Sequence, residues 1–165
     1  MPTRPTLETI LVADDDEAVL RVVVRILKRA GFLVLSADSG DAAIALAERT
    51  EQRIHLLLSD IDMPGISGPA LGEALKLARP EMHVMLMSGQ HDGALLVLNY
   101  GWAFIRKPFI SKKLVEMVTD VLHSPNRSQL GGEAFDSRND TPANREAEAK
   151  RRTAQADLNA REEDS

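Results

Sequence analysis

Short apolar runs recur along the first 123 residues and are separated by amphipathic stretches. Hydrophobicity within each run is continuous rather than alternating, which is typical of strands buried on both faces of a parallel sheet. The runs cover residues 10–13, 32–35, 55–58, 84–87 and 103–105. They predict five strands.

The stretches between and after these runs have the apolar spacing of amphipathic helices. The expected helices cover residues 17–30, 41–49, 69–78, 93–100 and 111–123. The apolar face of the first is formed by Val19, Val23, Ile26 and Ala30. We expect Gly31 to end the first helix and Ser111 to be the N-cap of the last. The pattern is weakest over 93–100, because that stretch is short and contains Gly93.

The alternation of five strands with five helices predicts right-handed βαβ units and therefore a doubly wound α/β domain. In such domains the functional site lies at the carboxyl ends of the strands, where the strand order reverses. The residues directly after each apolar run are therefore the candidates for function.

Composition changes near His123. Residues 124–165 contain only three apolar residues other than alanine, namely Leu130, Phe135 and Leu158. Such a segment buries too little surface to offset its ordering entropy. We interpret residues 1–123 as the domain and 124–165 as a polar, largely disordered tail. A short helix is possible from Thr141, as a solvated helix or as a segment that folds on a partner.

Composition also excludes several classes of protein. The 165 residues include no cysteine, which rules out disulfide scaffolds, cysteine zinc sites and thiol nucleophiles. No apolar stretch has the length of a membrane span or the form of a signal peptide, so we expect a cytoplasmic protein without a membrane partner. The net charge of −5 argues against general binding to DNA, and the tail is too short and polar for a DNA-binding domain.

Polar side chains follow four of the five runs. They are Asp14, Asp15 and Asp16 after the first, Asp60 and Asp62 after the third, Ser88 after the fourth and Lys107 after the fifth. Clustered carboxylates repel one another unless a cation neutralises them, and oxygen-only ligands favour Mg²⁺. With a lysine and a hydroxyl beside them, they suit phosphoryl transfer, and a carboxylate nucleophile would give an aspartyl phosphate.

Each of these segments also has a structural interpretation. The three consecutive aspartates could cap the next helix, where acidic residues favour the helix dipole. Asp60 and Asp62, followed by Pro64 and Gly65, could form an ordinary acidic turn. The histidines show no metal-ligand spacing, and we expect structural or surface roles for His55, His83, His91 and His123.

Taken together, these segments resemble the receiver domain of response regulators in two-component signalling. The resemblance rests on ILVADDD at 10–16, LSDIDMPGISG at 58–68, MSG at 87–89 and GWAFIRKPF at 101–109. It covers about residues 7–123. The stretches around Met63 and Met87 are also similar to receivers attached to hybrid histidine kinases.

The resemblance implies a flavodoxin-like sheet in the order 2-1-3-4-5. It also implies that Asp60 is phosphorylated by a histidine kinase or a histidine phosphotransfer protein in a phosphorelay. Asp15 and Asp60 would then bind Mg²⁺ through their side chains, Asp14 through water and Asp62 through its backbone carbonyl.

The resemblance further implies that Ser88 holds a phosphoryl oxygen and that Lys107 pairs with the phosphate. The Lys107–Pro108 peptide bond would be cis. Phe104 matches an aromatic switch position, whose rotamer follows the movement of Ser88. The surface around residues 93–120 would then change shape toward a downstream protein. Such a protein is a phosphoryl acceptor that assists its own phosphorylation and dephosphorylation, not a turnover enzyme.

Other interpretations share part of this pattern. Enzymes of the haloacid dehalogenase type also use Asp-x-Asp, but Pro64 stands where they have a threonine. A receiver-like scaffold that acts without phosphorylation would not need the complete set of acidic residues, Ser88 and Lys107. The chain is expected to be either a stand-alone regulator or a receiver cut from a larger kinase.

Overall fold

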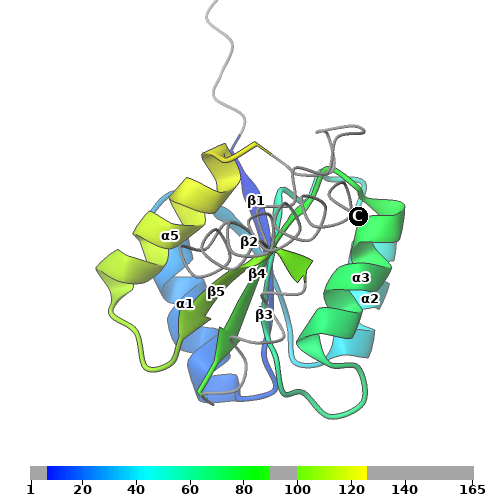
Figure 1. Ribbon diagram of the computed structural model, residues 1–165, viewed down its shortest axis with the longest axis horizontal. Coiled ribbons are helices and arrows are strands. Elements are labelled where there is room, and N and C mark those ends of the chain that lie inside the picture. Colours follow the sequence, from blue (N-terminus) through cyan, green and yellow to red (C-terminus); the bar gives the residue numbers. More distant parts are fainter. Residues whose placement is uncertain (1–6, 90–99, 126–165) are drawn as a thin grey trace, which may run out of the picture. The chain divides into compact units, whose positions relative to one another are not determined.

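The computed structural model describes residues 7–89 and 100–125, which contain a five-stranded parallel sheet with helices on both faces (Figure 1). The strands are β1 (Thr9–Ala13), β2 (Leu33–Ala37), β3 (Leu56–Asp60), β4 (His83–Ser88) and β5 (Ala103–Arg106). The helices are α1 (Glu17–Arg29), α2 (Gly40–Arg49), α3 (Gly68–Ala78) and α5 (Ser111–His123). The helix expected at 93–100 and the tail from 126 lie outside the described residues, apart from Tyr100.

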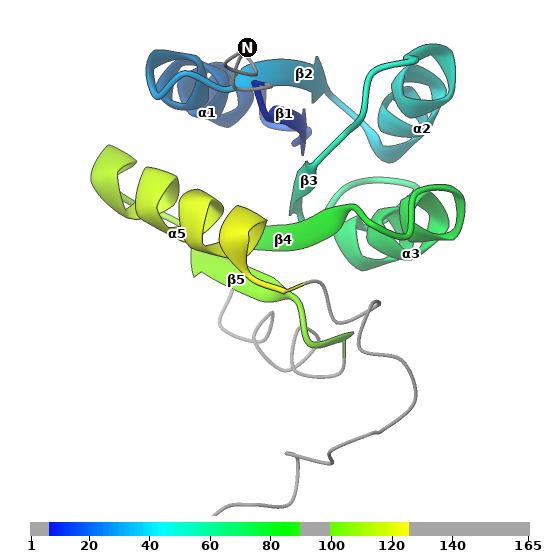
Figure 2. The same cartoon turned by 90° about the horizontal axis from the view of Figure 1, so that it is seen from above.

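The strand order is β2-β1-β3-β4-β5, which confirms the expected sheet. The chain moves outward in one direction from β1 to β2 and then returns past β1 to β3, so the order reverses beside β1. Since parallel crossovers are right-handed, this reversal places α1 on one face of the sheet and both α2 and α3 on the other. Figure 2 shows α1 and α5 on one face and α2 and α3 on the other.

The continuous hydrophobicity of the strands has a direct structural explanation. Every residue of β1 and β3 is buried, and successive residues point to opposite faces of the sheet. Ile10 and Val12 therefore pack beneath α1 and α5, whereas Leu11 packs beneath α2 and α3. The sheet thus separates two apolar clusters, and its central strands must be apolar on both sides.

Two details of the predicted helices are wrong. Ala30 is exposed, because α1 ends at Arg29 and Ala30 is its C-cap; Gly31, with a φ of +97°, ends the helix as expected. Ser111 is not an N-cap, because it already lies within α5. Ile110 holds the N-cap position in an extended conformation and has no side-chain oxygen to accept a hydrogen bond.

A glycine allows the start of α3 to approach the end of β3. The backbone N–H of Gly68 donates to the carbonyl of Ile61 at 2.9 Å. A Cβ atom on Gly68 would overlap the backbone carbonyl of Asp60 and lie 3.0 Å from Cα of Ile61. These are backbone atoms of a buried strand end, so they cannot move aside as a flexible side chain would.

We predict that Gly68→Ala lowers the free energy of unfolding by about 2 kcal/mol or more, because the added methyl group displaces the backbone around Asp60. Urea unfolding measures the change. Gly89→Ala is the matched control, since a Cβ atom at Gly89 would have no neighbour within 4 Å among the described residues. Equal stabilities of the two variants would contradict this prediction.

Candidate functional site

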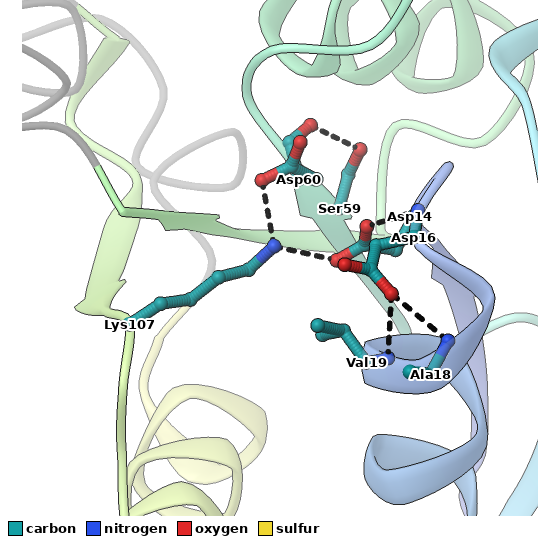
Figure 3. Close-up of polar contacts among 7 residues, drawn as sticks. All are labelled: Asp14, Asp16, Ala18, Val19, Ser59, Asp60 and Lys107. Atoms are coloured by element: carbon teal, nitrogen blue, oxygen red, sulfur yellow. Dashed lines mark hydrogen bonds and ion pairs between the residues drawn. The ribbon is translucent and has the colours of Figure 1, made fainter.

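Lys107 joins two carboxylates at the carboxyl edge of the sheet. Its Nζ lies 2.7 Å from Oδ2 of Asp14 and 3.0 Å from Oδ1 of Asp60 (Figure 3). Asp14 follows β1, Asp60 is the last residue of β3, and Lys107 follows β5. Since β1 and β3 are adjacent parallel strands, their ends place the two carboxylates side by side. The site therefore lies where the strand order reverses, as the sequence predicts.

The backbone after β5 positions Lys107. Its N–H donates to the carbonyl of Ser88 at 2.8 Å, which extends the pairing of β4 and β5 to the site. The Lys107–Pro108 peptide bond is cis, as the resemblance implies. Ser88 is the buried last residue of β4, so it too lies at this edge of the sheet.

The three consecutive aspartates do not share one role: one of them caps α1, and another lies buried at the site. Asp16 is the N-cap of α1, and its Oδ1 accepts from the backbone N–H groups of Ala18 and Val19 at 2.9 and 3.1 Å. Asp14 is completely buried, and its Oδ1 accepts from the N–H of Asp16 at 2.9 Å. The structure thus confirms capping for Asp16, whereas Asp14 pairs with Lys107 at the candidate site.

Three carboxylates meet the basic requirement of a site for a hard cation. Oxygen atoms of Asp14, Asp15 and Asp60 all lie within 4.8 Å of one another. Asp15 is exposed, whereas the other two are buried, so the cluster opens to solvent on one side. This oxygen-only donor set fits Mg²⁺, which keeps part of its water shell and binds few carboxylates. Asp62 is exposed and does not belong to this cluster.

Burial and charge act in opposite directions on the paired groups. Burial raises the pKa of Asp60, and the hydrogen bond and charge of Lys107 offset this only in part. Burial alone would lower the pKa of Lys107, but hydrogen bonds to Asp14 and Asp60 and their charges outweigh it and raise that pKa. The lysine therefore stays charged, and a nearby cation would further stabilise the ionised carboxylate of Asp60.

The remaining candidate residues, Phe104 and the histidines, lie in different parts of the fold. Phe104 is partly buried in β5 and packs against the cluster beneath α2 and α3. Nδ1 of His55 accepts the backbone N–H of Thr9 at 2.9 Å, a structural role. Of the other histidines, His83 is partly buried, His123 is exposed and His91 lies outside the described residues.

Sequence reasoning missed two contributors to this edge. The hydroxyl of Ser59 donates to the backbone carbonyl of Asp60 at 2.9 Å, and its position between the apolar run 55–58 and Asp60 was its signal. Gly68 was seen only as part of a motif, because its role depends on a close backbone approach that spacing does not reveal.

Comparisons with known proteins agree on one family. A family model described as the response regulator receiver domain matches residues 10–119. The chain is 31% identical over 117 residues to the sensor kinase CckA of Brucella abortus, covering 69% of this chain and 12% of that protein. It is 31% identical over 142 residues to the DNA-binding transcriptional regulator NtrC of Escherichia coli K12, covering 80% of this chain and 30% of that protein.

A solved structure gives the same result. The response regulator receiver domain protein of Clostridium thermocellum superposes with a TM-score of 0.65 at 28% identity, covering 75% of this chain and 98% of that one. The chain spans less than a third of the two curated relatives above, but nearly all of this receiver structure. Within the part of the chain that the structure describes, no helix is long and apolar enough to cross a membrane.

We predict that Mg²⁺ stabilises the folded protein through this carboxylate cluster. At a concentration tenfold above its dissociation constant, the ion should raise the free energy of unfolding by about 1.4 kcal/mol, because it binds the folded state only. Asp15→Asn should lose most of this gain. Urea unfolding with and without MgCl₂ measures it.

Asp16→Asn is the matched control for the metal prediction. It also removes one negative charge, but asparagine is an equally good N-cap and Asp16 lies outside the cluster. If Mg²⁺ stabilised both variants to the same extent, the assignment of the cluster would be wrong.

Proposed function

Because the chain belongs to the response regulator receiver family of two-component systems, we propose that Asp60 accepts a phosphoryl group from a histidine kinase or a histidine phosphotransfer protein. One observation carries this assignment. A partly buried lysine pairs with Asp60 beside two further carboxylates, at the edge of the sheet where the strand order reverses. Such a constellation provides a nucleophile and positive charge together.

The proposed reaction transfers a phosphoryl group from nitrogen to oxygen. A carboxylate oxygen of Asp60 attacks the phosphorus of a phosphohistidine that is protonated at its other ring nitrogen. The P–N bond breaks as the P–O bond forms, and the donor histidine leaves as a neutral imidazole that keeps this proton. Lys107 already holds Oδ1 of Asp60 at 3.0 Å, so its charge lies beside the phosphoryl oxygens. Ser88 would donate a hydrogen bond to one of these oxygens. A bound Mg²⁺ would supply further charge neutralisation.

The protein acts as an acceptor and switch in this proposal. Asp14 orients Lys107. Asp15 and Asp60 would hold the metal through their side chains, Asp14 through water, and Asp62 through its backbone carbonyl. Movement of Ser88 toward the phosphoryl group would change the packing of Phe104, since both residues lie on the adjacent strands β4 and β5. A downstream protein would read the altered surface. We place this function in the cytoplasm.

We predict that acetyl phosphate adds one phosphoryl group to the purified protein in the presence of Mg²⁺. Asp60→Asn should abolish the adduct, because the amide is not a nucleophile at this position. Intact-mass spectrometry measures the addition, and Asp16→Asn, which keeps the α1 cap, should be labelled as wild type.

Two outcomes would overturn the phosphorylation proposal. A folded protein that is labelled neither by acetyl phosphate nor by a phosphorylated histidine phosphotransfer protein would indicate a phosphorylation-independent scaffold. Repeated turnover of a small phosphate ester would indicate an enzyme of the haloacid dehalogenase type.

We predict that Asp62→Asn lengthens the half-life of the phosphorylated protein by about twofold or more. The exposed carboxylate lies two residues from Asp60 and can orient the water that attacks phosphorus. Loss of the adduct is followed by intact mass after removal of the phosphodonor, with Asp16→Asn as the charge-matched control. Equal half-lives of Asp62→Asn and wild type would refute this role.

A further inference from the structure

The outer edge of β2 plays no part in the proposed phosphoryl transfer. β2 lies at one end of the sheet and pairs only with β1 among the described strands (Figure 2). Leu33 donates its N–H to the carbonyl of Glu8 at 3.0 Å, and Ala37 accepts from the N–H of Asp14 at 3.2 Å. Alternate residues of a parallel strand bond to opposite neighbours, so Val34 and Ser36 direct their backbone groups outward.

This edge lacks the usual features that prevent strand addition. Proteins protect edge strands with charged residues, prolines or bulges. The sequence of β2 is LVLSA, without a charge or a proline, and its register with β1 continues without a bulge through all five residues. Leu33 is 40% exposed and Ser36 is also exposed. Among the residues that the structure describes, the strand therefore offers an open, uncharged backbone edge.

A groove runs beside this edge, between β2 and α1. Its volume is about 550 Å³. Leu20 and Val24 of α1 form apolar parts of its wall, and Ser36 lines it from β2. The charged residues around it are Glu17, Arg21, Arg25, Lys28 and Arg29. A segment lying along the edge of β2 would thus pack its side chains beside α1.

The charge around the groove is unlike that of the whole chain. The chain carries a net charge of −5, yet four of the five charged residues at the groove are basic. The single acidic residue at the groove, Glu17, already forms an ion pair with Arg21, in which Oε1 lies 3.8 Å from Nη1. Lys28 and Arg29 also favour the dipole at the end of α1, but this does not account for Arg21 and Arg25. Within residues 7–89 and 100–125, Arg25, Lys28 and Arg29 form no ion pair.

The open edge of β2 and the basic groove together indicate what kind of segment would bind here. Two copies of this chain paired edge to edge by a two-fold axis would bring one basic groove toward the other, and like charges oppose that arrangement. We propose that the edge of β2 binds an acidic, extended segment of a partner protein, which adds to the sheet as a further strand and lies along the basic groove of α1. Backbone hydrogen bonds give such a complex affinity, and charge selects the partner.

A proline substitution tests the strand-addition step. Ser36→Pro removes an outward N–H, and edge strands tolerate proline where that N–H faces solvent. The probe is a fluorescent peptide of about six residues that alternates glutamate with valine or threonine. Fluorescence anisotropy should show that Ser36→Pro binds it at least about tenfold more weakly than wild type. Ser36→Ala, which keeps the N–H, should bind as wild type does.

A second pair of variants tests the charge. Arg25→Gln should weaken binding of the probe several-fold, and added salt should weaken wild-type binding, because the attraction is screened. Lys113→Gln is the control, since Lys113 is an exposed cation of α5 that does not line the groove. A peptide with lysine in place of glutamate should not bind.

Hydrogen exchange measured by NMR tests the proposal in the wild-type protein. This test does not depend on whether Ser36→Pro folds. Saturating acidic peptide should slow amide exchange at Val34 and Ser36, whose N–H groups face outward, and change Leu35 less. No binding, or binding without this protection, would overturn the proposal. So would full binding by Ser36→Pro, or a wild-type dimer that this variant abolishes, which would identify a second copy as the occupant.

Discussion

The ion pairs of Lys107 with Asp14 and Asp60 are the interaction on which the site depends. Charges with little exposure are stable in a protein only when they are paired and hydrogen-bonded. Here Nζ of Lys107 pairs with two carboxylates, at 2.7 Å from Asp14 and 3.0 Å from Asp60. Lys107 follows β5, which is separated from β3 by β4 in the sheet. The ends of β1 and β3 and the start of the segment after β5 must therefore stay in register for the charges to remain compensated.

Backbone contacts maintain that register. The N–H of Lys107 donates to Ser88, the N–H of Gly68 donates to Ile61, and Asp16 caps α1 immediately after the site. These contacts are made by the backbone and by the α1 cap rather than by the reacting side chains. They fix where β3, β4 and β5 end and where α1 begins. The carboxylate cluster consequently needs no long, flexible loop to assemble it, and its remaining charge favours a bound cation.

The sheet also separates two kinds of surface. The carboxyl ends of β1, β3, β4 and β5 carry the candidate site, whereas the outer edge of β2 carries outward-facing backbone groups and a basic groove. A partner seated along β2 would meet the sheet from the side and leave Asp60 at the end of β3 accessible. Phosphoryl transfer and strand addition would therefore use different parts of the same scaffold.

The sequence by itself determined the five strands, the helices that the structure describes and the residues after each strand, because burial on both faces demands continuous apolar runs. It also identified Asp60, Lys107 and Ser88, since parallel strands end at one edge. Tertiary structure alone decided the rest. It assigned Asp14 to Lys107 and Asp16 to the α1 cap, made Gly68 necessary beside Asp60, and placed Ala30 outside its helix. Neighbouring aspartates are chemically identical, and only the directions of their side chains and the approach of distant backbone distinguish them.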